Sequence, residues 1–247
     1  MTAVTALTER VVHTAVRDFD LALGVLVPVG TLLGLNGALR NVIDTGAMSY
    51  AEYLVPAIIV QAMLLGAVTS ADRAGREQSS GLTFRLRTHP ISLLAPMIAR
   101  ITYCLLRGVL SLAAALAVGY LLLGFRLTGG FGCTVAFVAI PLCLTLAISL
   151  GADATGTRLR RIGGTQLLLM PQLILILVST GLAPAEAFPN WVQAFVRHQP
   201  VSQVTETIRG LAVGDIAGAQ VAITAAWCLG LLLVLAPIAV HLQRRPL

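Results

Sequence analysis

The sequence predicts an all-α membrane protein with six transmembrane helices, and three observations lead to this fold class. The 247 residues are 57% hydrophobic and 11% charged, with a mean hydropathy of +0.86, whereas soluble domains carry about 25% charged residues. Six uncharged runs are each long enough to cross a hydrocarbon core of about 30 Å as a helix. Arginines gather in alternate connecting segments. The predicted spans lie at about residues 21–39, 53–71, 101–124, 131–151, 163–183 and 217–241.

Residues 1–20 precede the first span and predict an amphipathic helix. Val4, Leu7 and Val11 recur at helical spacing, while Glu9 and Arg17 lie on the opposite side. Such a helix lies in the membrane interface on the cytoplasmic side; a solvated helix packed on a partner protein is the alternative. The charges in this stretch leave no apolar core for a cleavable signal peptide.

The arginine distribution predicts the orientation of the chain. With the N-terminus in the cytoplasm, twelve arginines fall in cytoplasmic segments and four, Arg40, Arg126, Arg197 and Arg209, fall outside. Cytoplasmic segments of membrane proteins carry the excess of positive charge. Both termini are therefore expected in the cytoplasm, with residues 21–247 forming a multi-pass domain in the cytoplasmic membrane.

The segment after the second span is the most charged connection in the chain. The run from Ser79 to Gly81 interrupts it, and His89 and Pro90 end the alternating pattern that follows. These residues predict a short amphipathic helix or turn that faces the cytosol over residues 72–92. A solvated loop whose arginines only fix the topology is the alternative.

Residues 184–215, between the fifth and sixth spans, combine prolines with apolar and aromatic residues. Neither apolar stretch in this segment is long enough to cross the membrane, and Trp191 favours the membrane–water interface. We expect two short half-helices, broken at Gln199 and Pro200, that dip into the outer leaflet; an ordinary surface loop is the alternative.

Arg107 is the one charge well inside a predicted span. Intramembrane charges are functional candidates by default. Its position in the cytoplasmic third of the span, away from the midplane, favours a structural or snorkelling role. Asp72 or Asp153, at the ends of neighbouring spans, is its candidate partner.

Several kinds of chemistry are excluded by missing residues. All 17 basic residues are arginine, so the chain lacks the lysine of a phosphate-binding loop. The motifs of zinc proteases and serine hydrolases are absent, and the four cysteines and four histidines are scattered. The net charge of +6 is expected to face anionic lipid headgroups. No enzyme activity, metal site or nucleic-acid partner is predicted.

Three features together resemble the ABC type-2 transporter permease family, and more closely its daunorubicin-resistance branch. The first is the amphipathic helix before six spans. The second is AGREQSSGL at 74–82 followed by LRTHPIS at 86–92, which is similar to the family's charged E-x-x-x-G stretch, leucine–arginine run and P-[IM]-[SA]. The third is STGL at 179–182, leading to FPNWVQAFVRHQPVS at 188–202 and RGL at 209–211.

The resemblance implies the membrane half of an ATP-driven exporter. Two permease subunits, identical or sister chains, would assemble with two separate ATPase subunits that bind ATP and Mg²⁺, so this chain would hold no cofactor. The substrate would be hydrophobic, either a lipophilic drug or a complex cell-wall lipid of the kind that mycobacteria export.

The resemblance also assigns roles by position. Residues expected to face the ATPase are Arg76, Glu77, Ser80, Gly81, Phe84, Arg85 and Pro90. Residues expected near an outer exit gate are Phe188, Pro189, Trp191, Gln199 and Pro200. Two other classes of function stay open: a gradient-driven secondary transporter or proton-channel subunit built around Arg107, and a purely structural or assembly protein.

Overall fold

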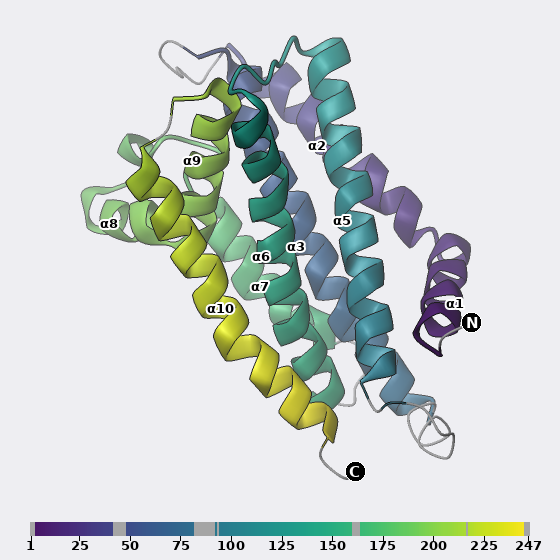
Figure 1. The fold of residues 1–247 in the computed structure, drawn as a ribbon. Coiled ribbons are helices and arrows are strands. Elements are labelled where there is room, and N and C mark those ends of the chain that lie inside the picture. The colour runs from purple at the N-terminus through teal and green to yellow at the C-terminus, as the bar shows by residue number, and fades with distance from the viewer. Residues whose placement is uncertain are drawn as a thin grey trace.

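The computed structural model describes residues 3–41, 48–81, 92, 94–159, 164–215 and 217–244, and these form helices without a strand. The element order is α1 (Ala3–Arg17), α2 (Asp20–Leu39), α3 (Tyr50–Ser79), α5 (Ala95–Leu122), α6 (Phe131–Leu159), α7 (Gly164–Leu177), the 3₁₀ turn η1 (Ala185–Ala187), α8 (Asn190–His198), α9 (Pro200–Val213) and α10 (Gly218–Arg244). The long helices lie side by side in one bundle (Figure 1). The all-α prediction is confirmed over these residues.

Five helices of the described chain are long and apolar enough to cross a membrane: α2, α3, α5, α6 and α10. They contain five of the six predicted spans, to within two residues at the ends of the third and sixth, where α5 stops at Leu122 and α10 begins at Gly218. The predicted fifth span, residues 163–183, instead contains α7, which has 14 residues and ends at Leu177. The described structure thus establishes a multi-pass helical membrane protein with five candidate spans.

Helix α3 forms the centre of the bundle. It packs against α2, α5, α6, α7 and α9, and most of its side chains are buried, including Leu54, Ile58 and Met63. Its contact with α6 is close: Gly156 lies against the carbonyl of Ala71, where a larger residue would clash with the backbone. In contrast, α2 and α10 lie at the periphery and expose much of their apolar surface, as expected of helices that face lipid.

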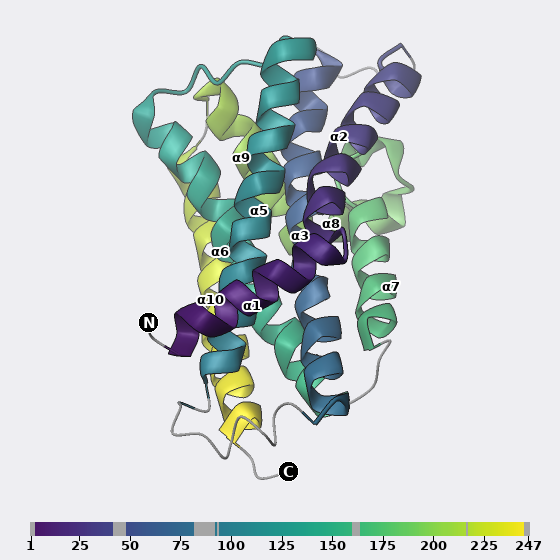
Figure 2. The same ribbon diagram turned by 90° about the vertical axis from the view of Figure 1, so that its right-hand side faces the viewer.

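Helix α1 crosses the bundle obliquely instead of running along it (Figure 2). Its Val11 and Ala15 pack against Ala99 and Tyr103 of α5. A sharp corner at Phe19, whose backbone is left-handed with φ of 58°, leads directly into α2. The structure therefore has the predicted amphipathic N-terminal helix, with its apolar face on α5.

The charged residues that were expected to mark span ends lie inside continuous helices. Residues 72–79, the first part of the predicted coupling segment, form the last two turns of α3. At the same end, α5 begins at Ala95, before Arg100, and α6 continues beyond Asp153. Helix α3 then ends where the sequence predicts a break, and Gly81 adopts φ of 70°, which a glycine permits without strain.

Candidate functional site

Two clusters of polar side chains lie in this apolar bundle, one toward the end where α1 lies and one at the corner between α8 and α9. We call them the α1-end cluster and the α9 cluster. The α1-end cluster comprises Asp20, Arg73, Glu77, Arg100, Tyr103, Arg107 and Asp153. The α9 cluster comprises Tyr53, Thr180, Gln199, Ser202, Glu206 and Arg209.

Arg100 joins three helices in the first half of the α1-end cluster. Its Nε and Nη2 atoms donate to the two carboxylate oxygens of Asp153 on α6, at 2.6 and 3.0 Å. Its Nη1 atom donates to Glu77 near the end of α3. The Arg100 and Asp153 side chains are 3% and 2% exposed. Two-point pairing of this kind fixes the geometry of both groups, so Arg100 sets how the ends of α3, α5 and α6 meet.

Asp20, at the start of α2, is the centre of the second half. It accepts hydrogen bonds from Arg73 Nη2 at 2.9 Å and from the Tyr103 hydroxyl at 2.6 Å, and its carboxylate lies 3.5 Å from Arg107 Nε. The Arg73 guanidinium also lies 4.3 Å from the centre of the Tyr103 ring. Asp20 therefore ties the start of α2 to α3 and α5.

Arg107 lies in a slot that two glycines create. A Cβ atom at Gly66 would lie 2.7 Å from Arg107 Nη1, and one at Gly24 would lie 3.0 Å from Nε. The residue is 4% exposed. The expected partners of Arg107 were wrong: it pairs with Asp20, because α2 packs on this face of α5, whereas Asp153 is occupied by Arg100.

The residues expected to face an ATPase divide between two sides of α3. Arg76 lies on the exposed side and pairs with Asp72 at 2.7 Å, whereas Glu77 turns inward to Arg100. Ser80 and Gly81 form the turn that ends the helix. Phe84, Arg85 and Pro90 lie outside the described residues.

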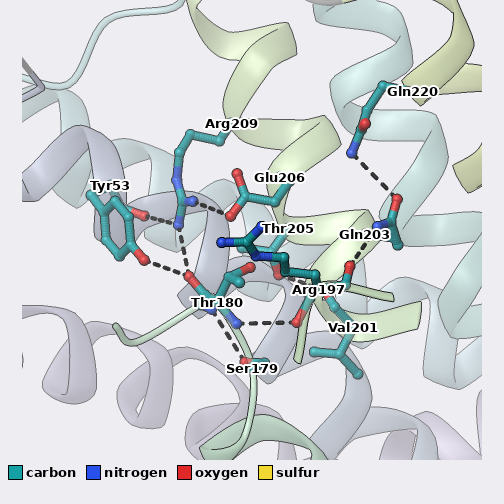
Figure 3. A network of polar contacts seen from close by, with 12 residues as sticks. Tyr53, Ser179, Thr180, Arg197, Val201, Gln203, Thr205, Glu206, Arg209 and Gln220 are labelled. Carbon is teal, nitrogen blue, oxygen red and sulfur yellow. Dashed lines mark hydrogen bonds and ion pairs between the residues drawn. The ribbon is translucent and has the colours of Figure 1, made fainter. Parts of the chain in front are cut away.

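Arg209 of α9 is the centre of the α9 cluster (Figure 3). Its guanidinium lies 3.6 Å from the centre of the Tyr53 ring on α3. It donates to Glu206 at 2.9 Å and to the backbone carbonyls of Tyr53 and Thr180 at 3.1 and 3.3 Å. The Tyr53 hydroxyl also donates to the Thr180 carbonyl, at 2.6 Å. Arg209 therefore fixes α9 and the segment after α7 against α3.

The corner between α8 and α9 is held by Gln199. Its side-chain amide donates to the carbonyls of Leu175 and Val178, at the end of α7. Pro200 occupies the first position of α9, where a missing N–H costs nothing. The predicted break at these two residues is thus present, and Gln199 additionally ties it to α7.

The other residues expected near an exit gate lie on and before α8. Pro189 precedes the helix, and Trp191 and Phe195 project from it with exposed fractions of 85% and 54%. Phe188 contributes its backbone carbonyl, which accepts from the Gln193 amide at 2.9 Å. Residues 188–198 therefore present aromatic surface, whereas Gln199 anchors the corner.

A cavity of about 490 Å³ opens beside the α9 cluster. It is lined by Met48, Tyr53, Thr180, Pro184, Ala185, Glu186, Arg197, Gln203, Glu206 and Arg209. Arg197 and Glu186 form an exposed ion pair at 2.8 Å on its rim. Its size falls within the range of small-molecule sites.

Sequence reasoning missed the central residue of each cluster. Arg100 and Arg209 were treated as markers of topology, because a charge beside an apolar run resembles a membrane boundary. A signal was present for Arg100: it lies seven residues before Arg107, on a similar face of α5. The cluster around Arg209 joins segments more than 150 residues apart, and no local pattern indicates that contact.

The helical spans and the two buried polar clusters define a polytopic membrane protein. Comparison with known families then gives the identity. The family model described as "ABC-2 family transporter protein" matches residues 37–241, so the chain belongs to the ABC-2 transporter family. It is the membrane subunit of an ABC transporter.

Similar proteins carry names of drug-resistance permeases. The chain is 30% identical over 244 residues to the "Probable doxorubicin resistance ABC transporter permease protein DrrC" of Mycobacterium tuberculosis, covering 96% of this chain and 87% of the relative. It is 31% identical over 217 residues to DrrB of that organism, named a doxorubicin resistance ABC transporter permease, covering 81% and 72%. It is 27% identical over 235 residues to the daunorubicin resistance permease DrrB1 of Streptomyces coeruleorubidus, covering 94% and 81%.

Proposed function

We propose that this chain is the permease subunit of an ATP-driven exporter that moves a hydrophobic substrate, a lipophilic drug or a complex lipid, out across the cytoplasmic membrane. The observation that carries the proposal is the ABC-2 family match, together with drug-resistance permeases that align over nearly the whole chain. Membership in this family favours an ATP-driven exporter over the gradient-driven alternative, and Arg107 serves in our proposal as the partner of Asp20.

The energy in this proposal comes from separate ATPase subunits that bind ATP and Mg²⁺. The chain has no lysine with which to build a phosphate-binding loop, and the ABC-2 family implies a system with an ATPase. A second permease, either another copy or a sister chain, would complete the passage.

The proposed topology has six spans, with both termini in the cytoplasm. Helix α7, as part of the predicted span at 163–183, would supply the sixth span beyond the five candidates. Helices α8 and α9 would dip into the outer leaflet, and the exposed Trp191 and Phe195 of α8 suit that boundary. Buried hydrogen bonds of Gln199 and Arg209 satisfy the backbone where the helices break, as non-helical backbone at that depth requires.

The coupling segment would contact the ATPase through Arg76, Ser80 and Gly81 of the described chain, with Phe84, Arg85 and Pro90 beyond it. Glu77 would act from inside the permease: because it pairs with Arg100, and Arg100 with Asp153, movement of the α3 end would be passed to α5 and α6. The single side chain of Arg100 would thus connect the docking end to the membrane passage.

Mass spectrometry of the complex purified from its native membrane through a tag on this chain tests the proposal. We expect an ATPase with a phosphate-binding loop, and a second permease if the assembly is mixed. Recovery of this chain with no ATPase, under conditions that keep a known ABC exporter of the same membrane intact, would contradict the proposal.

A further inference from the structure

One side of the central helix α3 is left partly open. Between residues 53 and 71, every residue of α3 is buried except Gln61, Leu65 and Thr69, which are half-buried and recur at intervals of four residues. Side chains at this spacing lie on one side of a helix. Asp72 continues the same side toward the α1 end of the bundle. We call these four residues the α3 stripe.

The α3 stripe stops at Gln61. On the same side of the helix, Ile58 and Leu54 lie one and two turns earlier and are 1% and 0% exposed. The segment after α7 lies directly on this part of α3, because a Cβ atom at Gly181 would be 3.2 Å from the Cβ atom of Ala57. The α9 cluster packs on the next turn. The stripe is therefore open toward the α1 end and closed toward the α9 cluster.

A small pocket lies at the closed end of the stripe, between α3, α7 and α9. Its lining comprises Ala57, Gln61, Ile176, Ser179, Gly181, Leu182, Val201 and Thr205. Its volume of about 10 Å³ suits about one water-sized group. The hydroxyls of Ser179 and Thr205 each donate to a backbone carbonyl, so they can only accept from a further group.

Gln61 is the unsatisfied polar group of this pocket. Its carboxamide makes no hydrogen bond with any residue that the structure describes, and neither of its polar atoms is closed off from the surroundings. It lies about 16 Å along the helix axis from Tyr50, the first residue of α3, which is about halfway across a hydrocarbon core. A carboxamide left against hydrocarbon costs about 1–3 kcal/mol. A lipid tail is therefore a poor occupant, and a molecule with a hydrogen-bonding group is a good one.

We propose that the α3 stripe lines the substrate passage and that Gln61 is a specificity-determining residue, which binds the hydroxyl or carbonyl group of a lipophilic substrate. The inference rests on the proposed exporter function, because a substrate that enters from the open end is stopped at the closed one. The carboxamide can donate to a carbonyl and can either donate to or accept from a hydroxyl. The apolar body of the substrate would lie along Leu65.

Binding of Nile red to the full chain in phosphatidylcholine nanodiscs tests the proposal. This lipophilic dye has a carbonyl that accepts hydrogen bonds, and its emission moves to longer wavelength when it does so. Empty nanodiscs correct for dye in the lipid. We expect a saturable, long-wavelength component that dodecanol displaces and dodecane does not. Absence of that component, or equal displacement by the alcohol and the alkane, would overturn the proposal.

Gln61→Met is the most specific variant, because it keeps the length and shape of the side chain and removes the carboxamide. We expect about two- to tenfold weaker dye binding, the effect of one neutral hydrogen bond, and a thermal midpoint that is unchanged or higher. Thr69→Val is the matched control on the same stripe, since the Thr69 hydroxyl already donates to the Gly66 carbonyl at 2.6 Å. Equal affinity in the two variants would contradict the role of Gln61, and a lower midpoint with unchanged affinity would mark that residue as structural.

Leu65→Cys tests whether a second copy of the chain covers the stripe instead. The variant and the wild-type chain, which has four cysteines of its own, are oxidised with copper phenanthroline in their native membrane. We expect no dimer that is specific to the variant. A disulfide-linked dimer formed only by Leu65→Cys would assign the stripe to a contact between copies and sink the inference.

None of these measurements uses ATP, so the inference and the proposed function can fail separately. Dye binding by a chain that purifies without an ATPase would count against the exporter function alone. Recovery of an ATPase with a chain that does not bind the dye would count only against the role of Gln61.

Discussion

Arg100 holds three helices together at the α1 end of the bundle. Its two-point contact with Asp153 and its contact with Glu77 need the planar, forked guanidinium. A lysine keeps the charge but makes a single point of contact, so one partner is left without its full set of hydrogen bonds.

We therefore expect Arg100→Lys to lower the free energy of unfolding by about 1.5–3 kcal/mol, the range for a hydrogen bond to a charged group. In the complex it should reduce transport more than ATP hydrolysis, since Glu77 and Asp153 would no longer move together. The two rates, measured in proteoliposomes, check this. Arg126→Lys, at an exposed arginine outside the cluster, is the control. If the ratio of transport to ATP hydrolysis is the same in both variants, the proposed role of Arg100 is refuted.

The slot around Arg107 gives a second prediction at this scale. Gly66→Leu would place its side chain where the guanidinium lies, so Arg107 would be displaced from Asp20. Overpacking of this kind costs about 1–3 kcal/mol, measured as a lower midpoint of thermal unfolding. Gly30→Leu, where a Cβ atom meets open space, should leave the midpoint unchanged. Equal midpoints in the two variants would show that the slot carries no constraint.

At the scale of helices, the α8–α9 corner depends on a tether to α7. Gln199→Ala would leave the carbonyls of Leu175 and Val178 without this donor, at a cost of about 1–3 kcal/mol. Faster amide hydrogen exchange in α8 and α9 is the expected readout. Gln193→Ala, whose amide bonds only within residues 188–193, should change exchange locally. If both variants exchange alike throughout α9, the tether is not what holds the corner.

The agreement between the helices predicted from the sequence and those in the structure differs from helix to helix. The apolar runs predicted five helices well because burial in lipid requires little beyond length and hydropathy. The helix ends were less predictable: Glu77 and Arg100 interrupt the apolar pattern, but their helices continue through them because each charge finds a buried partner. A pattern along one chain segment contains no information about a partner on another.

The candidate site was also predictable only in part: its local backbone break could be predicted from the sequence, and its long-range contacts could not. The break at Gln199 and Pro200 follows from local backbone chemistry, since proline favours the first turn of a helix. The contacts of Arg209 with Tyr53 and Thr180 arise only when α9 packs on α3. The family resemblance thus located the segment, and the structure supplied the interactions within it.

For the whole molecule, the two clusters lie in different parts of one bundle that is centred on α3. The α1-end cluster includes Arg73 and Glu77 from the end of α3, and the α9 cluster includes Tyr53 from its first turn. Helix α3 therefore connects the proposed docking end with the proposed exit. A shift of α3 along its axis would act on both clusters.

Transport by purified components tests the central proposal most directly. The chain, reconstituted in proteoliposomes with its co-purified ATPase, should move a fluorescent lipophilic drug in an ATP-dependent, vanadate-sensitive manner, whereas the chain alone should neither hydrolyse ATP nor drive accumulation. Vanadate-sensitive ATP hydrolysis by the chain alone, or drug accumulation that follows an imposed proton gradient and ignores ATP, would contradict it.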